Sequence, residues 1–242
     1  MTASALRALH HGRTPGDPLV LPGPWDAASA RVFADAGFPA LATPSAGIAA
    51  SLGYEDGQTP ADEMFAAVAR IARAVSVPVS ADIEAGYGLA PGELVERLLT
   101  AGAVGCNLED TVDGVLVDAG WQADRLAAVR EAAGDGLFVN ARIDTYLRSV
   151  PDGADREAET VRRARLYAAA GADCVYPLGA PPEALPRLAA AVPGPLNALA
   201  RPDGPGPRGL GELGAARITF GPGMQLRAMA AVREIADGLR KA

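Results

Sequence analysis

The sequence predicts an α/β protein whose strands and helices alternate and close into a single (β/α)8 barrel, the TIM barrel. Short apolar, β-branched runs recur along the 242 residues, and each is followed by a helical pattern. Helices end at an Ala-Gly pair directly before the next strand, as at Ala36-Gly37, Ala101-Gly102 and Ala170-Gly171. The strands are almost continuously apolar, which is typical of a parallel sheet covered on both faces.

The first half of the chain supplies a lead segment and four strand–helix units. Residues 1–18 combine a helix-prone start with a Pro/Gly-rich linker, and no shift in composition marks a second domain within 1–242. The helix of the second unit is strongly amphipathic, with Thr59 or Asp62 near its start. The expected strands are 19–23, 40–43, one that starts at Val77, and 105–110; the expected helices are 27–36, 61–75, 91–101 and 124–133, with loops at 48–60 and 111–120.

The second half supplies four more units. Its strands are expected at 137–144, 173–177, 195–199 and 217–220, and its helices at 156–170, 182–191, 209–213 and 225–239. Eight units are the number that closes a parallel sheet into a barrel.

Scarce residue types exclude several kinds of chemistry. Lys241 is the only lysine and is next to last, which excludes a Schiff-base aldolase and a P-loop enzyme. His10 and His11 precede the first strand, which argues against a Ser-His-Asp triad or a histidine-built zinc site. Cys106 and Cys174 lie in apolar runs and are interpreted as small buried hydrophobic residues.

Charge and hydropathy limit the partners. The formal net charge is -7 and there is no basic cluster, which argues against nucleic acid and anionic membranes. No apolar run reaches the roughly 18 residues that a membrane span needs. The first thirteen residues lack the basic-then-apolar pattern of a signal peptide, so we expect a cytoplasmic protein.

Carboxylates gather where the third and fourth strands end. Asp82 and Glu84 stand two apart, so they share a side if the chain is extended, and Gly86 and Gly88 then allow a sharp turn. Glu109 comes from the next strand. Three carboxylates this close repel one another unless a cation lies among them, and Mg²⁺ with one direct and two water-mediated contacts would suffice. The alternative is a solvated acidic loop.

Other polar residues at strand ends suit a small acid. Arg142 offers a fixed fork for a substrate carboxylate, although it could instead only pair with Asp144. Ser45 and the backbone amides of Ala46 and Gly47 could hold another carboxylate oxygen. Asp26, Asn140 and Asn197 complete the set of polar residues at strand ends. The barrel would bring these residues to one mouth.

Five motifs in this order resemble the isocitrate lyase/phosphoenolpyruvate mutase superfamily, over about 19–239. They are Trp25-Asp26-Ala27-Ala28-Ser29-Ala30, Ser45-Ala46-Gly47 with Leu52-Gly53-Tyr54-Glu55-Asp56, Asp82-Ile83-Glu84-Ala85-Gly86-Tyr87-Gly88, Leu108-Glu109-Asp110, and Asn140-Ala141-Arg142-Ile143-Asp144.

The resemblance implies a Mg²⁺-dependent barrel (Mn²⁺ is an alternative ion) that acts on a small 2-oxo or 2-hydroxy acid through a metal-stabilised enolate. Asp82 looks like the direct metal ligand, and Glu84 and Glu109 look like ligands that act through water. Arg142 looks like the carboxylate binder, and Asp56 matches an acid on a mobile loop. We count Tyr54 with Asp56, Glu109 and Arg142 as catalytic candidates. The substrate-binding candidates are Trp25, Asp26, Ser45, Ala46, Gly47, Asn140, Arg142 and Asn197.

The chain also departs from the better-known branches. Isocitrate and methylisocitrate lyases carry a Lys-x-Cys-Gly-His lid, whereas 111–114 here contains no Cys, Lys or His. Phosphonate-acting members use a lysine in that loop and a histidine near strand six, which here ends Tyr176-Pro177-Leu178. Glu84 replaces the commoner Asp.

Three hypotheses about function follow. The first is a lyase that cleaves a C–C bond, with oxaloacetate decarboxylation or acetylhydrolysis as a subtype and with water, Tyr54 or Tyr87 as proton donor. The second is an enzyme that acts on a P–C bond. The third is a metabolite-binding barrel without turnover.

The sequence of the last helix indicates that the chain associates with copies of itself. Its broad apolar stripe follows a Gly-Pro-Gly hinge at 221–223, so we expect a homo-oligomer, a tetramer or a dimer, in which the helix packs on a neighbour. The alternative is an ordinary eighth helix folded on its own barrel.

Overall fold

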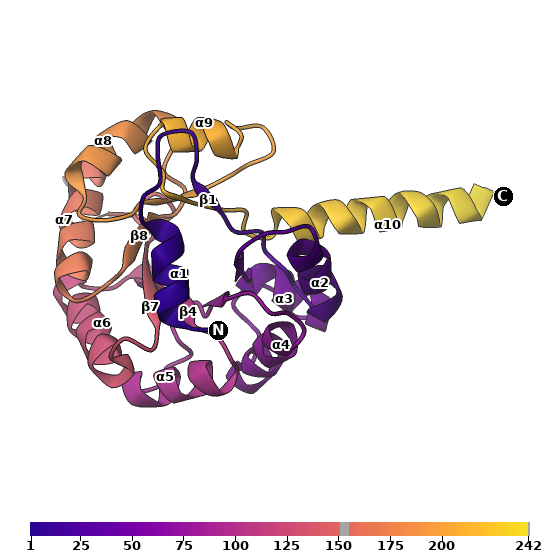
Figure 1. The fold of residues 1–242 in the computed structure, drawn as a ribbon, viewed down its shortest axis with the longest axis horizontal. Coiled ribbons are helices and arrows are strands. Elements are labelled where there is room, and N and C mark those ends of the chain that lie inside the picture. Colours follow the sequence, from indigo (N-terminus) through magenta and orange to yellow (C-terminus); the bar gives the residue numbers. More distant parts are fainter. Residues whose placement is uncertain (151–154, 242) are drawn as a thin grey trace.

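A computed structural model that describes residues 1–150 and 155–241 confirms the (β/α)8 barrel (Figure 1). Its parallel strands form a three-stranded sheet, in the order β1-β10-β9, and a five-stranded sheet, in the order β2-β3-β4-β7-β8. A bridge between Val175 and Leu196 joins β8 to β9. The amide of Ala42 donates to the carbonyl of Pro22 at 3.1 Å, next to the ends of β1 and β2. The two sheets therefore close on each other.

The strands and helices follow the predicted order. The barrel strands are β1 (Leu19–Val20), β2 (Leu41–Ala42), β3 (Val79–Asp82), β4 (Gly105–Glu109), β7 (Phe138–Ile143), β8 (Cys174–Pro177), β9 (Asn197–Leu199) and β10 (Arg217–Thr219). The helices are α1 (Ala3–His10), α2 (Ala27–Asp35), α3 (Ser45–Leu52), α4 (Ala61–Arg73), α5 (Pro91–Thr100), α6 (Ala119–Ala133), α7 (Arg156–Ala169), α8 (Leu185–Ala191) with a 3-10 turn at Pro182–Ala184, α9 (Pro207–Glu212) and α10 (Gly223–Lys241).

The lead segment forms α1, which lies across the barrel in Figure 1 and covers the end where the strands begin. Leu6 is fully buried there among Leu19, Phe138 and Cys174. Gly105 is needed at this point, because a Cβ on it would lie 2.8 Å from the Leu6 side chain. The segment predicted as a lead is therefore part of the barrel's core.

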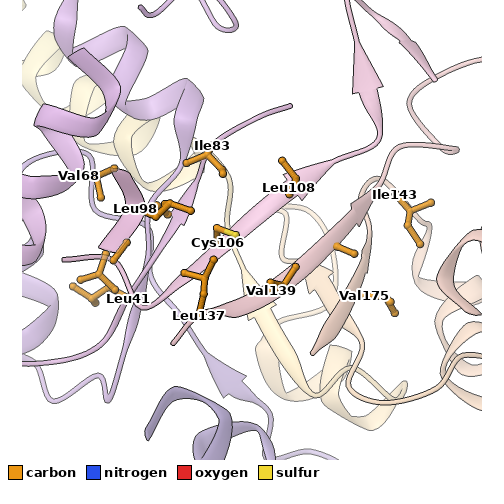
Figure 2. Close-up of a cluster of buried hydrophobic side chains, with 14 of the residues drawn as sticks. Leu41, Val68, Ile83, Leu98, Cys106, Leu108, Leu137, Val139, Ile143 and Val175 are labelled. Atoms are coloured by element: carbon orange, nitrogen blue, oxygen red, sulfur yellow. The ribbon is translucent and has the colours of Figure 1, made fainter. Parts of the chain in front are cut away.

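Alternation along the strands separates two layers of packing. Cys106, Leu108, Val139 and Val175 face outward and pack under the surrounding helices, as Figure 2 shows. The residues between them on β4, β7 and β8 face the barrel interior. Both cysteines are buried free thiols, in agreement with the interpretation from sequence.

Four local predictions need correction. Residues 45–52 form helix α3 rather than a strand end and loop, because Ile48 and Ala49 are buried and Gly53, with a φ of 87°, ends the helix. Residues 111–120 contain a hairpin, β5 (Thr111–Val112) and β6 (Val115–Leu116), joined by Asp113 and Gly114 at φ of 48° and 78°. Two positive φ angles fit the two-residue turn that matches strand twist.

The third and fourth corrections concern where elements begin and end. Helix α6 begins at Ala119, five residues before the predicted start, because the Asp118 carboxylate accepts the amide of Trp121 as an N-cap. Strand β3 ends at Asp82, and Glu84 has a left-handed φ of 51°. The alternation argument for Asp82 and Glu84 therefore fails, since the chain is not extended between them.

Helix α10 extends away from the barrel (Figure 1). Gln225 is its only buried residue in the described part of the chain. Its apolar side chains are exposed: Leu226, Met229, Val232, Ile235 and Leu239. Within 1–150 and 155–241, no helix is both long enough and apolar enough to cross a membrane.

Candidate active site

A cavity of about 250 Å³ opens where the barrel strands end. Its lining comes from every side of the barrel: Ala42, Thr43, Pro44, Ser45, Ala46, Asp56, Asp82, Asn107, Arg142, Leu147, Tyr176, Leu178, Leu199, Arg201, Thr219, Gly221 and Pro222. A wider depression of about 890 Å³ lies against α7 on the outside of the barrel and shares none of these residues. The convergence of polar groups from different strands makes the smaller cavity the candidate site.

Arg142 is a charged group of this site that several hydrogen bonds and ion pairs hold in place. Its Nε and one Nη donate to the two Asp144 oxygens at 2.7 and 2.9 Å, and its other Nη lies 2.5 Å from Glu109 Oε2. Burial alone would lower the pKa of Arg142, but Asp82, Asp144 and Glu109 raise it above its ordinary range, so the guanidinium stays charged. These contacts use three of its five N–H groups, which leaves donors for a substrate.

A buried network holds Arg142 from behind. The Asp144 carboxylate also accepts from the Thr111 hydroxyl at 3.0 Å, and the Asp144 amide donates to Asp110 at 2.9 Å. Asp110 in turn accepts from Arg163 at 2.9 Å and from Tyr167 at 2.8 Å. The pairing of Arg142 with Asp144, which the sequence offered as an alternative role, is therefore present. It orients the guanidinium and still leaves N–H groups for a substrate.

Three carboxylates lie beside Arg142. Asp82 Oδ2 accepts from the Ser45 hydroxyl at 3.1 Å, whereas Asp82 Oδ1 and Glu84 Oε1 are enclosed without any partner in the described residues. Burial raises the pKa of Asp82. Burial, followed by repulsion from Asp82 and Asp56, raises the pKa of Glu84 to about 7. Burial raises the pKa of Glu109 to about 8, against the lowering effect of Arg142.

Such a cluster fits an oxygen-bound cation. Enclosed carboxylate oxygens with no donor are costly, and a hard divalent ion would satisfy them. In the residues that the structure describes, no three acidic, His or Cys side chains converge closely enough to bind one ion directly. The donor set therefore fits an ion with one direct carboxylate and others reached through water.

Further polar groups line the cavity on strands next to those of Asp82 and Arg142. Tyr176 and Thr219 line it, with the Thr219 hydroxyl 3.2 Å from the Tyr176 hydroxyl. Burial raises the pKa of Tyr176 to about 12. Arg201 and Asn107 complete this lining. None of these four residues was assigned a role from the sequence. The position of Asn107, two before Glu109 on one strand, was the available signal for it.

The structure brings some predicted residues to the cavity and not others. Ser45, Ala46, Asp56, Asp82 and Arg142 line it, while Glu84 and Glu109 lie behind the lining next to Asp82 and Arg142. The predicted substrate binders Trp25, Asp26, Gly47, Asn140 and Asn197 are not part of the lining.

Each of these absences from the lining has a local cause. Asp26 is the N-cap of α2, where its carboxylate accepts the Ser29 amide at 2.7 Å. Gly47 lies within α3, where a Cβ would come 2.9 Å from Pro44. Asn140 and Asn197 are fully buried, and their side chains bond to Asn107 and Thr219, which line the cavity instead. Trp25 is half-buried and packs against the hydrophobic core.

The two tyrosines proposed as proton donors, Tyr54 and Tyr87, also lie outside the cavity lining. The Tyr54 hydroxyl donates to Glu63 at 2.6 Å, and Tyr54 does not line the cavity. The Tyr87 hydroxyl is enclosed without a partner in the described residues, and burial with nearby Glu84 and Asp82 raises its pKa above its ordinary range. Neither hydroxyl faces the open cavity.

Comparison with known proteins agrees with the family resemblance seen in the sequence. The family model described as phosphoenolpyruvate phosphomutase matches residues 6–240. An uncharacterised protein of Mycobacterium tuberculosis (strain ATCC 25618 / H37Rv) is 36% identical over 237 residues, which cover 95% of this chain and 88% of the relative.

Solved structures with this fold include a lyase, an acetylhydrolase and a hydrolase. A 2,3-dimethylmalate lyase, a member of the PEP mutase/isocitrate lyase superfamily, is 31% identical with a TM-score of 0.85, covering 100% of this chain and 88% of that one. An oxaloacetate acetylhydrolase bound to 3,3-difluorooxalacetate is 27% identical with a TM-score of 0.86, covering 98% and 86%. A phosphonopyruvate hydrolase bound to oxalate and Mg²⁺ is 25% identical with a TM-score of 0.87, covering 100% and 88%.

Proposed function

The chain belongs to the phosphoenolpyruvate phosphomutase family, and from that premise we propose that it is a Mg²⁺-dependent lyase for a small 2-oxo or 2-hydroxy dicarboxylate. The bond cleaved would be a C–C bond, with oxaloacetate among the first substrates to test. The observation that carries the proposal is the cluster of enclosed carboxylates beside a charged arginine in a cavity of about 250 Å³.

Asp82 would hold the metal directly, and Glu84 and Glu109 would hold it through water. Mn²⁺ would be accepted by the same oxygen ligands. When bound, the ion supplies a positive charge next to the 2-oxygen of the substrate, where negative charge grows as the enolate forms. The unpartnered oxygens of Asp82 and Glu84 support this assignment.

Arg142 and the start of α3 would bind the acid. The free N–H groups of Arg142 suit one substrate carboxylate, because its other donors are fixed by Asp144 and Glu109. The Ser45 hydroxyl donates to Asp82 in the free protein, so its role is to orient the metal ligand. Ala46 lines the cavity next to it. Asp56 lies at the rim, on the segment that precedes α4.

Tyr176 is the proton donor that the geometry favours. When the C–C bond breaks, its electron pair stays on the enolate carbon, and that carbon must then take a proton. Tyr176 lines the cavity, and its pKa of about 12 keeps the phenol protonated at neutral pH. Tyr176→Phe should lower kcat by about a hundredfold or more with KM nearly unchanged. Steady-state kinetics that show an unchanged kcat would assign the step to water instead.

A P–C bond enzyme is the second candidate, and the similarity to phosphonopyruvate hydrolase favours it. A single assay separates the alternatives. Purified protein with Mg²⁺ is given oxaloacetate, 2-hydroxy dicarboxylates and phosphonopyruvate, and the release of pyruvate, oxalate, glyoxylate and phosphate is followed, with EDTA and Asp82→Ala as controls. Metal-dependent carboxylate products from oxaloacetate or a 2-hydroxy dicarboxylate support the lyase, and phosphate release from phosphonopyruvate supports the second candidate. Binding without any turnover would indicate the metabolite-binding barrel.

The oligomer remains a proposal that α10 supports. A helix with five exposed large apolar side chains needs a partner surface. We propose that α10 packs on a second copy of the chain, in a dimer or tetramer. Light scattering should give a mass that is a multiple of 24.6 kDa, and truncation before Gly223 should lower it. A monomer mass at micromolar concentration would contradict this.

A further inference from the structure

Arg217 is a cation enclosed in the barrel interior below the candidate site. It is fully buried on β10, and within the described residues it forms no ion pair with a carboxylate. A buried charge without a counter-ion is costly, so its remaining contacts need an explanation. Among the described residues, the side chain has two hydrogen-bond partners, Ser80 Oγ at 3.4 Å and Asn107 Oδ1 at 3.3 Å, both bonded by one Nη. The guanidinium also lies over the Phe138 ring, 5.9 Å from its centroid.

Asn107 is also bonded to a second amide. Asn140 Nδ2 donates to Asn107 Oδ1 at 2.8 Å. Two paired amides can satisfy one hydrogen bond in either direction, because each group has a donor end and an acceptor end. The pair alone therefore leaves open which end of Asn107 faces the cavity.

Arg217 removes this ambiguity. A guanidinium can only donate, so the Asn107 end that faces it must be the oxygen. The Asn107 amide nitrogen is then turned the other way. It has no hydrogen-bond partner in the described residues, and it is not enclosed, whereas Asn140 Oδ1 is. Since Asn107 lines the cavity, its N–H₂ group is the end that faces the open space.

We propose that Asn107 is a substrate-binding donor of this site and that Arg217 is the positioning residue that fixes its polarity. Asn107 lies opposite Asp82 in the pairing of β3 with β4, so its N–H₂ group would donate to a substrate oxygen next to the metal ligand. This inference rests on the proposed function. It adds a neutral donor that would stabilise the anionic oxygen without competing for the ion.

The test uses oxalate, a small planar dianion, titrated calorimetrically in Mg²⁺ into full-length variants. Asn107→Leu should weaken oxalate binding about tenfold or more, the effect of one hydrogen bond to a charged group. Arg217→Met should weaken it at least about twofold, the factor expected if the two polarities become equally populated. Ser80→Ala removes the other Arg217 contact and should leave the affinity unchanged.

Two further variants separate positioning from a structural role. Asn107→Asp gives Arg217 a carboxylate partner but removes the donor, so the unfolding midpoint should hold or rise while oxalate affinity falls. If Asn107→Leu fails to fold, this variant carries the test. In the Asn107→Leu, Arg217→Met double variant, the loss should equal that of Asn107→Leu alone.

The outcomes are distinguishable. Wild-type affinity in Asn107→Leu, with Mg²⁺-dependent binding by the wild type, would overturn this inference and leave the proposed function standing. If Arg217→Met weakens oxalate binding further in the Asn107→Leu background, Arg217 acts on the ligand by its own charge, which would overturn its positioning role. A wild-type protein that binds no oxalate in Mg²⁺ would overturn both.

Discussion

The two ends of the barrel interior are built from opposite kinds of residue. At the end where strands finish, Asp82, Glu84 and Glu109 surround Arg142, and several of their polar atoms lack partners in the described chain. At the other end, Leu6 of α1 packs against Phe138 and Leu19 in a mainly apolar layer. The buried polar exceptions there are His10 and Arg217, which both contact the Phe138 ring. The first end holds costly unsatisfied groups, and the second supplies burial that offsets them.

The difference indicates which substitutions change chemistry and which change stability. Residues at the strand ends should matter for activity more than for folding, and residues under α1 should do the reverse. Four predictions test this division, from the largest expected effect to the smallest.

Asp82→Ala should abolish Mg²⁺-dependent turnover, by about a thousandfold or more, because the proposed direct ligand is lost. The barrel should stay folded, since Asp82 Oδ1 is enclosed without a partner and its removal relieves that cost. Turnover and thermal unfolding measured on the same preparation check both parts. Asp118→Ala, which removes the N-cap of α6, is the matched control and should lower stability slightly without loss of turnover. Wild-type Mg²⁺ affinity in Asp82→Ala would rule out the assignment.

Leu6→Ala should lower the free energy of unfolding by about 2–5 kcal/mol, because it leaves a cavity between α1 and the starts of the barrel strands. Turnover at a temperature below the unfolding transition should be unchanged. Denaturant titration and steady-state kinetics measure the two effects. A large loss of activity with little loss of stability would break the division between the two ends.

His10 should make stability depend on pH. Burial, and then the nearby Arg217, lowers the pKa of His10 from 6.5 to about 3. The unfolded chain therefore takes up a proton below pH 6.5 that the folded chain refuses until about pH 3, so stability falls as pH falls through this window. From pH 7.5 to 5 the His10 contribution should be about 2 kcal/mol.

The variant His10→Phe isolates this effect, because it keeps a ring against Phe138 without a titrating group. The difference in unfolding free energy between wild type and variant should change by that amount over the same pH range. A difference that stays constant would show that His10 is already solvated in the folded state.

Cys106→Ala and Cys174→Ala should have the smallest effects. Both thiols are buried, and burial raises the pKa of each to about 12, so neither is a thiolate at neutral pH. Turnover should stay within about twofold, with a stability cost of about 1 kcal/mol each. A loss of more than about a hundredfold with the fold intact would restore cysteine to the mechanism.

Much of this architecture could be predicted from the sequence, because it depends on local patterns. Strand periodicity and the Ala-Gly helix ends gave the order of the units and placed Asp82, Glu109 and Arg142 at one mouth. Helix α3 was missed because Gly47 and Gly53 resemble loop residues, while burial of Ile48 and Ala49 decides for helix. The Asp113-Gly114 turn was the available signal for the hairpin.

The less predictable part depends on contacts across the barrel. Asp26 has the composition of a site residue, yet its carboxylate caps α2. Asn107 and Tyr176 were passed over, whereas Asn140 and Asn197 were chosen and do not line the cavity. The sequence does not show which neutral polar side chain on a barrel strand reaches the open space. Arg217 shows the limit most clearly, since its contact with Asn107 joins residues 110 positions apart in the sequence.

One measurement tests the central assignment most directly: calorimetric titration of oxalate into the wild-type protein, with saturating Mg²⁺ and with EDTA. Oxalate should bind in Mg²⁺ and not in EDTA, and Asp82→Ala should bind it in neither condition. Equal affinity with and without the metal, or undiminished binding by Asp82→Ala in Mg²⁺, would contradict the assignment.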